Sequence, residues 1–102
     1  MIMSTELFIG VKIQPDVLAI SVLEGQQEYQ SLLLHTAVGW QAMLSLLCDF
    51  APTHQVAVAI AGQQAVELAL QLPENLRIQV FVVAARPDQT TRELAIYAKH
   101  AA

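Results

Sequence analysis

The sequence predicts an α/β domain built on a mixed β-sheet that carries helices on both faces. Three observations support this fold class. Short apolar segments rich in β-branched residues come first and are joined by turn residues. Apolar residues at helical spacing begin only after Thr36, and strand-like and helical segments then alternate. With 102 residues, 55% of them hydrophobic, residues 1–102 are expected to form a single domain around one core.

The first three elements are predicted to be strands at residues 7–13, 17–23 and 29–34. Gln14, Pro15 and Asp16 supply turn chemistry between the first two strands, and the segment 24–27 separates the second from the third. Because short turns join consecutive strands, we expect an antiparallel meander.

A helix is predicted next, with Thr36 as its N-cap and Pro52 after its end. Trp40 and Met43 lie on its apolar face with Leu44 and Leu47, so we expect them in the core rather than in a binding site. Residues 56–61 contain no polar side chain, which is typical of an internal strand that is covered on both faces.

The remaining elements are a short helix around residues 66–70 that Pro73 ends, a fifth strand at residues 77–83, and a final helix. Asp88 is the expected N-cap of this helix, and Lys99 and His100 suit its C-terminal end. Helices that connect strands of one sheet require those strands to be parallel. The order therefore predicts five strands, three in a meander and two added through helical crossovers.

Composition and charge exclude several function classes. The formal net charge is −4, and the five cationic residues are scattered, so nucleic-acid binding by this chain alone is not expected. Cys48 is a lone cysteine in an apolar stretch, which favours a buried, inert thiol. The wholly apolar runs are too short for a membrane span, and no secretion signal is seen, so a cytoplasmic location is expected.

Four segments resemble insertion-sequence transposases with a RuvC-like N-terminal domain, which has the ribonuclease H-like fold. Residues 9–18 (IGVKIQPDVL) resemble the opening strand, turn and strand of that family, and residues 35–44 (HTAVGWQAML) are similar to its Asn-Thr-x-x-Gly helix start. The Ala61-Gly62 pair looks like its Thr-Gly turn, and Val82, Val83 and Arg86 match its Val-Val-Asn-Pro-Arg strand end. The resemblance implies a ribonuclease H-like fold for nearly the whole chain.

The same resemblance argues against catalysis. Enzymes of the family hold two Mg²⁺ ions about 4 Å apart with a set of carboxylates. Lys12 stands where the family has its first-strand Asp, and Ala59 stands beside Ile60 where it has a Glu. Asp88 or Glu93 could supply one late acid, but a single carboxylate near an ammonium cannot hold two metals. We therefore expect no catalytic residues, no metal site and no cofactor.

Lys12 has two interpretations. Strand alternation could turn it to an edge or surface where the ammonium reaches water. Alternatively, it lies with Gly62 in the crevice at the strand ends and, with backbone N–H groups of the second helix, forms an anion- or nucleotide-binding site. Actin-like ATPase domains open similarly, but residues 13–16 lack the glycines with which those domains wrap phosphate.

The other chemistry-bearing residues form no recognisable motif. His35, His54 and His100 lack partners at metal-ligand spacing, and no serine lies in a Gly-x-Ser-x-Gly turn. The low charge and the Gln-rich polar segments favour self-association. The sequence therefore predicts a catalytically inactive, ribonuclease H-like interaction or scaffold module that forms a homo-oligomer or binds another protein. The resemblance is compatible with an origin as a remnant of a mobile element. The alternative is a small anion-binding or weak nuclease domain that uses the crevice.

Overall fold

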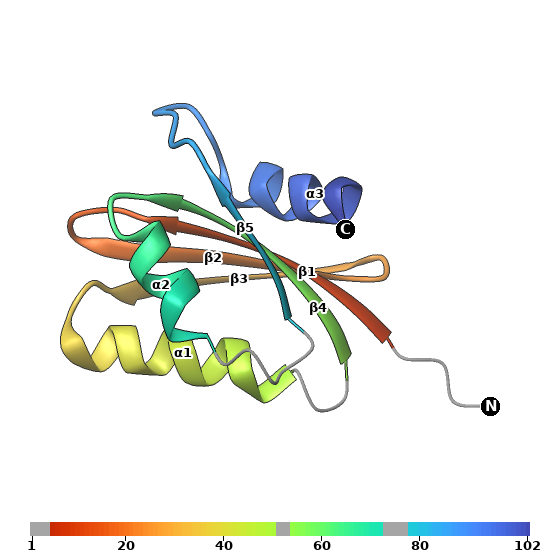
Figure 1. The fold of residues 1–102 in the computed structure, drawn as a ribbon, viewed down its shortest axis with the longest axis horizontal. Coiled ribbons are helices and arrows are strands. Elements are labelled where there is room, and N and C mark those ends of the chain that lie inside the picture. The colour runs from red at the N-terminus through yellow and green to blue at the C-terminus, as the bar shows by residue number, and fades with distance from the viewer. Residues whose placement is uncertain (1–4, 51–53, 73–77) are drawn as a thin grey trace.

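The computed structural model of the protein describes residues 5–50, 54–72 and 78–102. Within these ranges, five strands and three helices follow one another in the predicted order (Figure 1). The bounds of these elements are β1 Thr5–Ile13, β2 Val17–Glu24, β3 Gln27–Leu34, α1 Ala37–Phe50, β4 His54–Gly62, α2 Ala65–Gln71, β5 Ile78–Val83 and α3 Thr91–Ala101.

The five strands form one mixed sheet in the order β3-β2-β1-β4-β5. The strand β2 pairs antiparallel with both β1 and β3, which confirms the meander. The strands β1, β4 and β5 are parallel, as the helical crossovers require. The strand β4 is internal, and its residues Val56 to Ala61 are buried, as the wholly apolar run predicted.

The helices lie on both faces of the sheet, with α1 and α2 on one face and α3 on the other (Figure 1). Large branched side chains face α1 and α2, and we call this side the aliphatic face. It includes Leu7, Ile9, Val11, Ile13, Leu18, Ile20, Val22, Val56, Val58 and Ile60, packed with Met43, Leu47 and Leu68.

Small residues face α3, and we call this side the alanine face. Strand alternation turns every second residue of β1, β2 and β4 to this side, where Leu94, Ala95 and Ala98 of α3 are fully buried. The alanine face contains Gly10, Ser21, Ala57, Ala59 and Ala61.

Capping agrees with the sequence at one helix and differs at another. Thr36 caps α1, because its Oγ1 accepts a hydrogen bond from the Gly39 N–H at 3.0 Å. The prediction of Asp88 as the cap of α3 is wrong: Thr90 is the N-cap, and its Oγ1 accepts from the Glu93 N–H at 3.1 Å. Pro52, Pro73 and Arg77, which sequence analysis placed at element ends, lie outside the described residues.

Candidate functional site

Lys12 and Gly62 lie together at the carboxyl ends of β1 and β4. In the parallel pairing of these strands, Lys12 lies opposite Ala61, and Ile13 lies opposite Gly62. The predicted juxtaposition of the two residues in sequence-distant strands is therefore present. The carboxyl ends of parallel strands are where open α/β sheets commonly bind ligands.

The Lys12 ammonium contacts the segment that leads into α3. Its Nζ donates a hydrogen bond to the Gln89 carbonyl at 2.7 Å and to the Pro87 carbonyl at 3.4 Å. The side chain is half-buried, so it does not simply extend into water. Lys12 thus ties the end of β1 to the connection between β5 and α3.

Gly62 has a conformational role at the end of β4. Its φ of +125° is rarely adopted by residues with a side chain, and an added Cβ would lie 2.3 Å from the Ile13 carbonyl oxygen. The helix α2 begins three positions later at Ala65 and has seven residues. Gly62 therefore lets the chain leave β4 in close contact with β1, and its part in an anion site stays a prediction.

The alanine face is closed by α3 around Gly10 and Ala59. Ala59 is fully buried, and a Cβ added to Gly10 would lie 2.0 Å from the Thr91 carbonyl oxygen of α3. The Ser21 and Thr91 hydroxyls, 2.6 Å apart, form a further link between the sheet and this helix. The helix α3 therefore lies directly on β1 at Gly10, and its backbone covers this part of the face. Across the described segments, no three His, Cys, Asp or Glu residues come together in a way that could hold a metal ion.

His35 and His54 take part in local contacts. His35 Nδ1 lies 2.8 Å from the Gln14 carbonyl oxygen, and its ring stacks on Trp40 at a centroid distance of 5.8 Å. His54 Nε2 lies 3.2 Å from a carboxylate oxygen of Glu24. These contacts link turns and strand ends, as is common for histidines with structural roles.

The residues predicted for the α1 core differ in burial. Met43 is fully buried, as expected. Trp40 is only partly buried, and its indole N–H donates to the Gln71 side-chain oxygen of α2 at 2.6 Å. Cys48 is also partly buried, in contact with the core on the aliphatic face.

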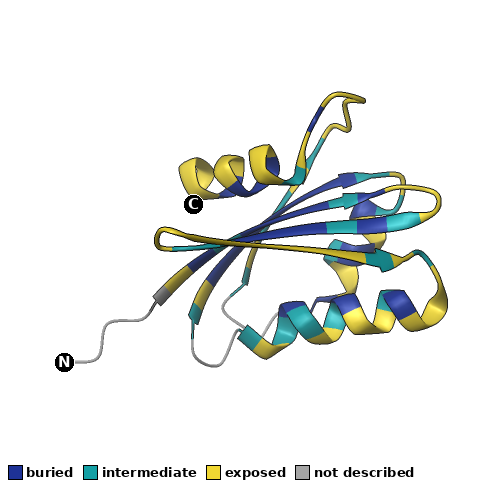
Figure 2. Ribbon diagram, turned by 180° about the vertical axis from the view of Figure 1, so that it is seen from behind, coloured by how far each residue is buried: buried dark blue, intermediate teal, exposed yellow. Residues whose placement is uncertain are grey.

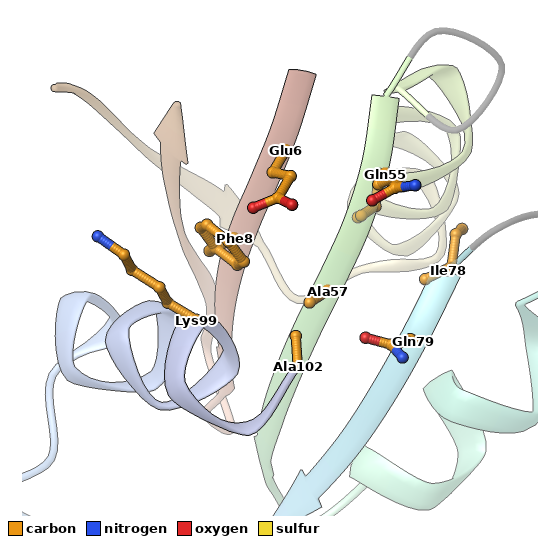
Figure 3. Close-up of a pocket in the computed structure, with 9 residues that line it drawn as sticks. Glu6, Phe8, Gln55, Ala57, Ile78, Gln79, Lys99 and Ala102 are labelled. Carbon is orange, nitrogen blue, oxygen red and sulfur yellow. The ribbon is translucent and has the colours of Figure 1, made fainter. Parts of the chain in front are cut away.

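A shallow cavity that the sequence did not reveal lies at the opposite, amino end of the parallel strands. It has a volume of about 470 Å³ and lies between β1, β4, β5 and the end of α3 (Figure 3). Phe8 and Ala57 form its apolar wall, and the Glu6 and Gln79 side chains turn toward it, whereas the Lys99 ammonium extends away. Strand alternation could have predicted that Glu6 and Phe8 lie on one face of the sheet. It could not have predicted that the end of α3 lies above them.

The most exposed apolar strand is β3, at one edge of the sheet. Leu32 and Leu34 are 74% and 69% exposed, and only Leu33 of this strand is partly buried. In Figure 2, β3 is exposed along almost its whole length, while neighbouring strands of the same sheet are largely buried. The sequence predicted a strand at residues 29–34 but did not show that this strand lies at an edge.

Comparison of the sequence with protein-family models and with curated proteins finds no match. Across residues 5–50, 54–72 and 78–102, no helix combines the length and the apolar character needed to cross a bilayer.

Proposed function

We propose that the chain is a ribonuclease H-like module, related to the N-terminal domain of insertion-sequence transposases, that is catalytically inactive and acts by binding protein, above all a second copy of itself. The sheet order 3-2-1-4-5, with a meander followed by two helical crossovers, is compatible with this fold. The four sequence segments that resemble the family fall on its opening hairpin, its first helix and the ends of two parallel strands.

The contact between α3 and the centre of the sheet carries the proposal. Metal-dependent phosphodiester chemistry needs an open space with several oxygen ligands. Here Gly10, Ser21 and Ala59 lie under α3, and the nearby Lys12 ammonium is bound by main-chain carbonyls. The close packing of α3 on this region supports a function on the exposed surfaces of the domain.

The exposed surface of β3 supports a binding role. Two leucines on one side of this edge strand expose apolar area to water next to unpaired backbone groups. Edge strands of natural proteins usually carry features that prevent pairing with another chain. Binding of a protein strand would pair these backbone groups and cover one flank of the leucine side chains.

Two measurements on the purified protein test this function. We expect no cleavage of labelled DNA or RNA with Mg²⁺ or Mn²⁺ and no shift of backbone amide resonances at residues 10–12 and 59–62 on metal addition. We also expect sedimentation velocity to show a monomer–dimer equilibrium between micromolar and millimolar protein. Metal-dependent cleavage that Lys12→Ala abolishes, or a monomer at every concentration, would overturn the proposal.

Anion binding at Lys12 is a second candidate. An ammonium carries three N–H donors, and that of Lys12 donates to two carbonyls, so one donor is left for an anion. Gly62 lies at the same end of the parallel strands. A rise in melting temperature with phosphate or sulfate in the wild type that Lys12→Met loses would support this candidate. Equal shifts in both proteins would exclude it.

A further inference from the structure

We propose that β3 pairs antiparallel with β3 of a second copy about a two-fold axis at Ser31, which joins the two sheets into one. This inference rests on the proposed function and specifies the surface and the register of the self-association. It pairs residues 28–34 of one copy with the same residues of the other, with Ser31 opposite Ser31 and Leu32 opposite Gln30.

The exposure of β3 marks it as the open edge. Seven of its eight residues are exposed, while β5, the other edge strand, has six residues of which four are partly buried. The ladder between β2 and β3 runs without interruption from Val17 opposite Leu34 to Glu24 opposite Gln27, so no bulge twists the edge away. The strand also contains neither lysine nor proline, the residues that commonly block edge pairing.

The hairpin sets which backbone groups point outward. Gly25, with φ of +59°, allows a two-residue turn between Glu24 and Gln27, and such a turn is closed by a hydrogen-bonded pair. Hydrogen-bonded pairs recur at every second position, so the odd residues of β3 bond to β2 and the even residues present N–H and C=O groups at the edge. These are Glu28, Gln30, Leu32 and Leu34.

A two-fold axis at Ser31 matches these groups to one another. It places Glu28 opposite Leu34 and Gln30 opposite Leu32, so that each outward-pointing residue meets another outward-pointing residue. It also keeps each side chain on its own face of the joined sheet, because directly opposed residues in a ladder point to the same side. The Leu32 side chains of the two copies become diagonal neighbours. Within the β3 bounds, a centre at Gln30 also pairs seven residues, but only the Ser31 centre pairs all four outward-pointing residues.

The charge distribution permits a second copy to bind at this edge. Each copy has a formal net charge of −4, so two copies repel unless they meet through weakly charged surface. In β3 only Glu28 is charged, and its carboxylate lies 3.6 Å from Arg92 Nε of the same chain. The Ser31 register keeps the two Glu28 side chains at opposite ends of the paired segment.

The size of the contact predicts a weak dimer. Seven paired residues at about 3.4 Å each span roughly 24 Å of strand. A contact along one strand edge of that length buries less surface than the roughly 800 Å² per partner of a standard interface. We therefore expect an equilibrium that depends on concentration rather than a permanent dimer.

Cysteine cross-linking tests the register. In a Cys48→Ala background, Ser31→Cys places two thiols at a non-hydrogen-bonded antiparallel pair, where the Cα atoms are about 4.5 Å apart and a disulfide can form. We expect mild oxidation to give a covalent dimer in high yield from Ser31→Cys and a low yield from Leu32→Cys. A higher yield from Leu32→Cys, or none from either variant, would overturn the register.

Charge insertion tests the edge itself. We expect Leu32→Lys to weaken dimerisation at least ten-fold in sedimentation, because it brings cations into the paired edge. Leu70→Lys is the matched control, since Leu70 is a similarly exposed leucine on α2. Melting curves check that both variants remain folded. A wild-type dimer that survives Leu32→Lys would overturn β3 pairing but leave the proposed function, whereas a wild-type monomer at every concentration would overturn both.

Discussion

The two faces of the sheet are packed by opposite means. On the aliphatic face, branched side chains such as Val58 and Ile60 fill the space below α1 and α2. On the alanine face, Ala59 and Gly10 leave so little volume that the backbone of α3 lies in direct contact with β1. One face is therefore stabilised by apolar volume, and the other by the closeness of a helix to the strands.

The difference is encoded in the alternation of β4. From Val56 to Ala61 the strand alternates a large branched residue with alanine, and alternation assigns the large residues to one face and the alanines to the other. All six residues are apolar, so hydropathy does not separate the faces but size does. Substitutions that remove side-chain volume should therefore destabilise the protein most on the aliphatic face. Substitutions that add side-chain volume should destabilise it most on the alanine face.

The largest expected effect comes from loss of volume on the aliphatic face. Ile60→Ala should lower the free energy of unfolding by about 4 kcal/mol, because Ile60 is fully buried and the surrounding side chains can close the cavity only in part. Its neighbour supplies the control: Ala59→Gly should lower that free energy by about 1 kcal/mol. Urea denaturation measures both. Equal losses would contradict the division between the faces.

Addition of a single methyl group to the alanine face should have the next largest effect. Gly10→Ala places a Cβ within 2.0 Å of the Thr91 oxygen and 2.6 Å of the Ala95 nitrogen, so α3 must move. We expect the free energy of unfolding to fall by about 3 kcal/mol. Amide hydrogen exchange should accelerate more in α3 than in α1.

The same change at Gly25 is the control for this prediction. No atom lies within 4 Å of a Cβ added there, so only the positive φ opposes it. A loss of about 1 kcal/mol is expected for Gly25→Ala. If Gly10→Ala cost no more than this, α3 would not be held against β1 as described.

Much of the fold could be predicted because strand and helix periods leave a direct trace in the sequence. The meander, the parallel crossovers and the internal position of β4 followed from residue spacing and turn residues. The N-cap of α3 was misplaced because Asp88 and Thr90 are both good capping residues, and the choice depends on where α3 settles on the sheet. Local sequence does not contain that tertiary contact.

The candidate site was predictable only in part, for a similar reason. Parallel pairing brought Lys12 and Gly62 to one edge, as expected from topology. The partners of Lys12 could not be predicted, because the Pro87 and Gln89 carbonyls come from an irregular segment 75 and 77 residues away in the chain. The exposure of β3 could not be predicted either, because its position at an edge depends on the order of all five strands.

The smallest of the predicted stability effects tests the first interpretation of Lys12, an ammonium that reaches water. Lys12→Met keeps the apolar stem but removes the ammonium that binds the Gln89 and Pro87 carbonyls, so we expect a loss of about 1 kcal/mol in urea denaturation. Lys99→Met is the control, because that ammonium is exposed on α3 and its removal should change stability by less than about 0.5 kcal/mol. The loss at Lys12 should come with faster hydrogen exchange at the start of α3, since the bonds fix the segment that precedes it. If the two variants were equally stable, the Lys12 ammonium would be solvated in solution, and only its aliphatic stem would contribute to the link between β1 and α3.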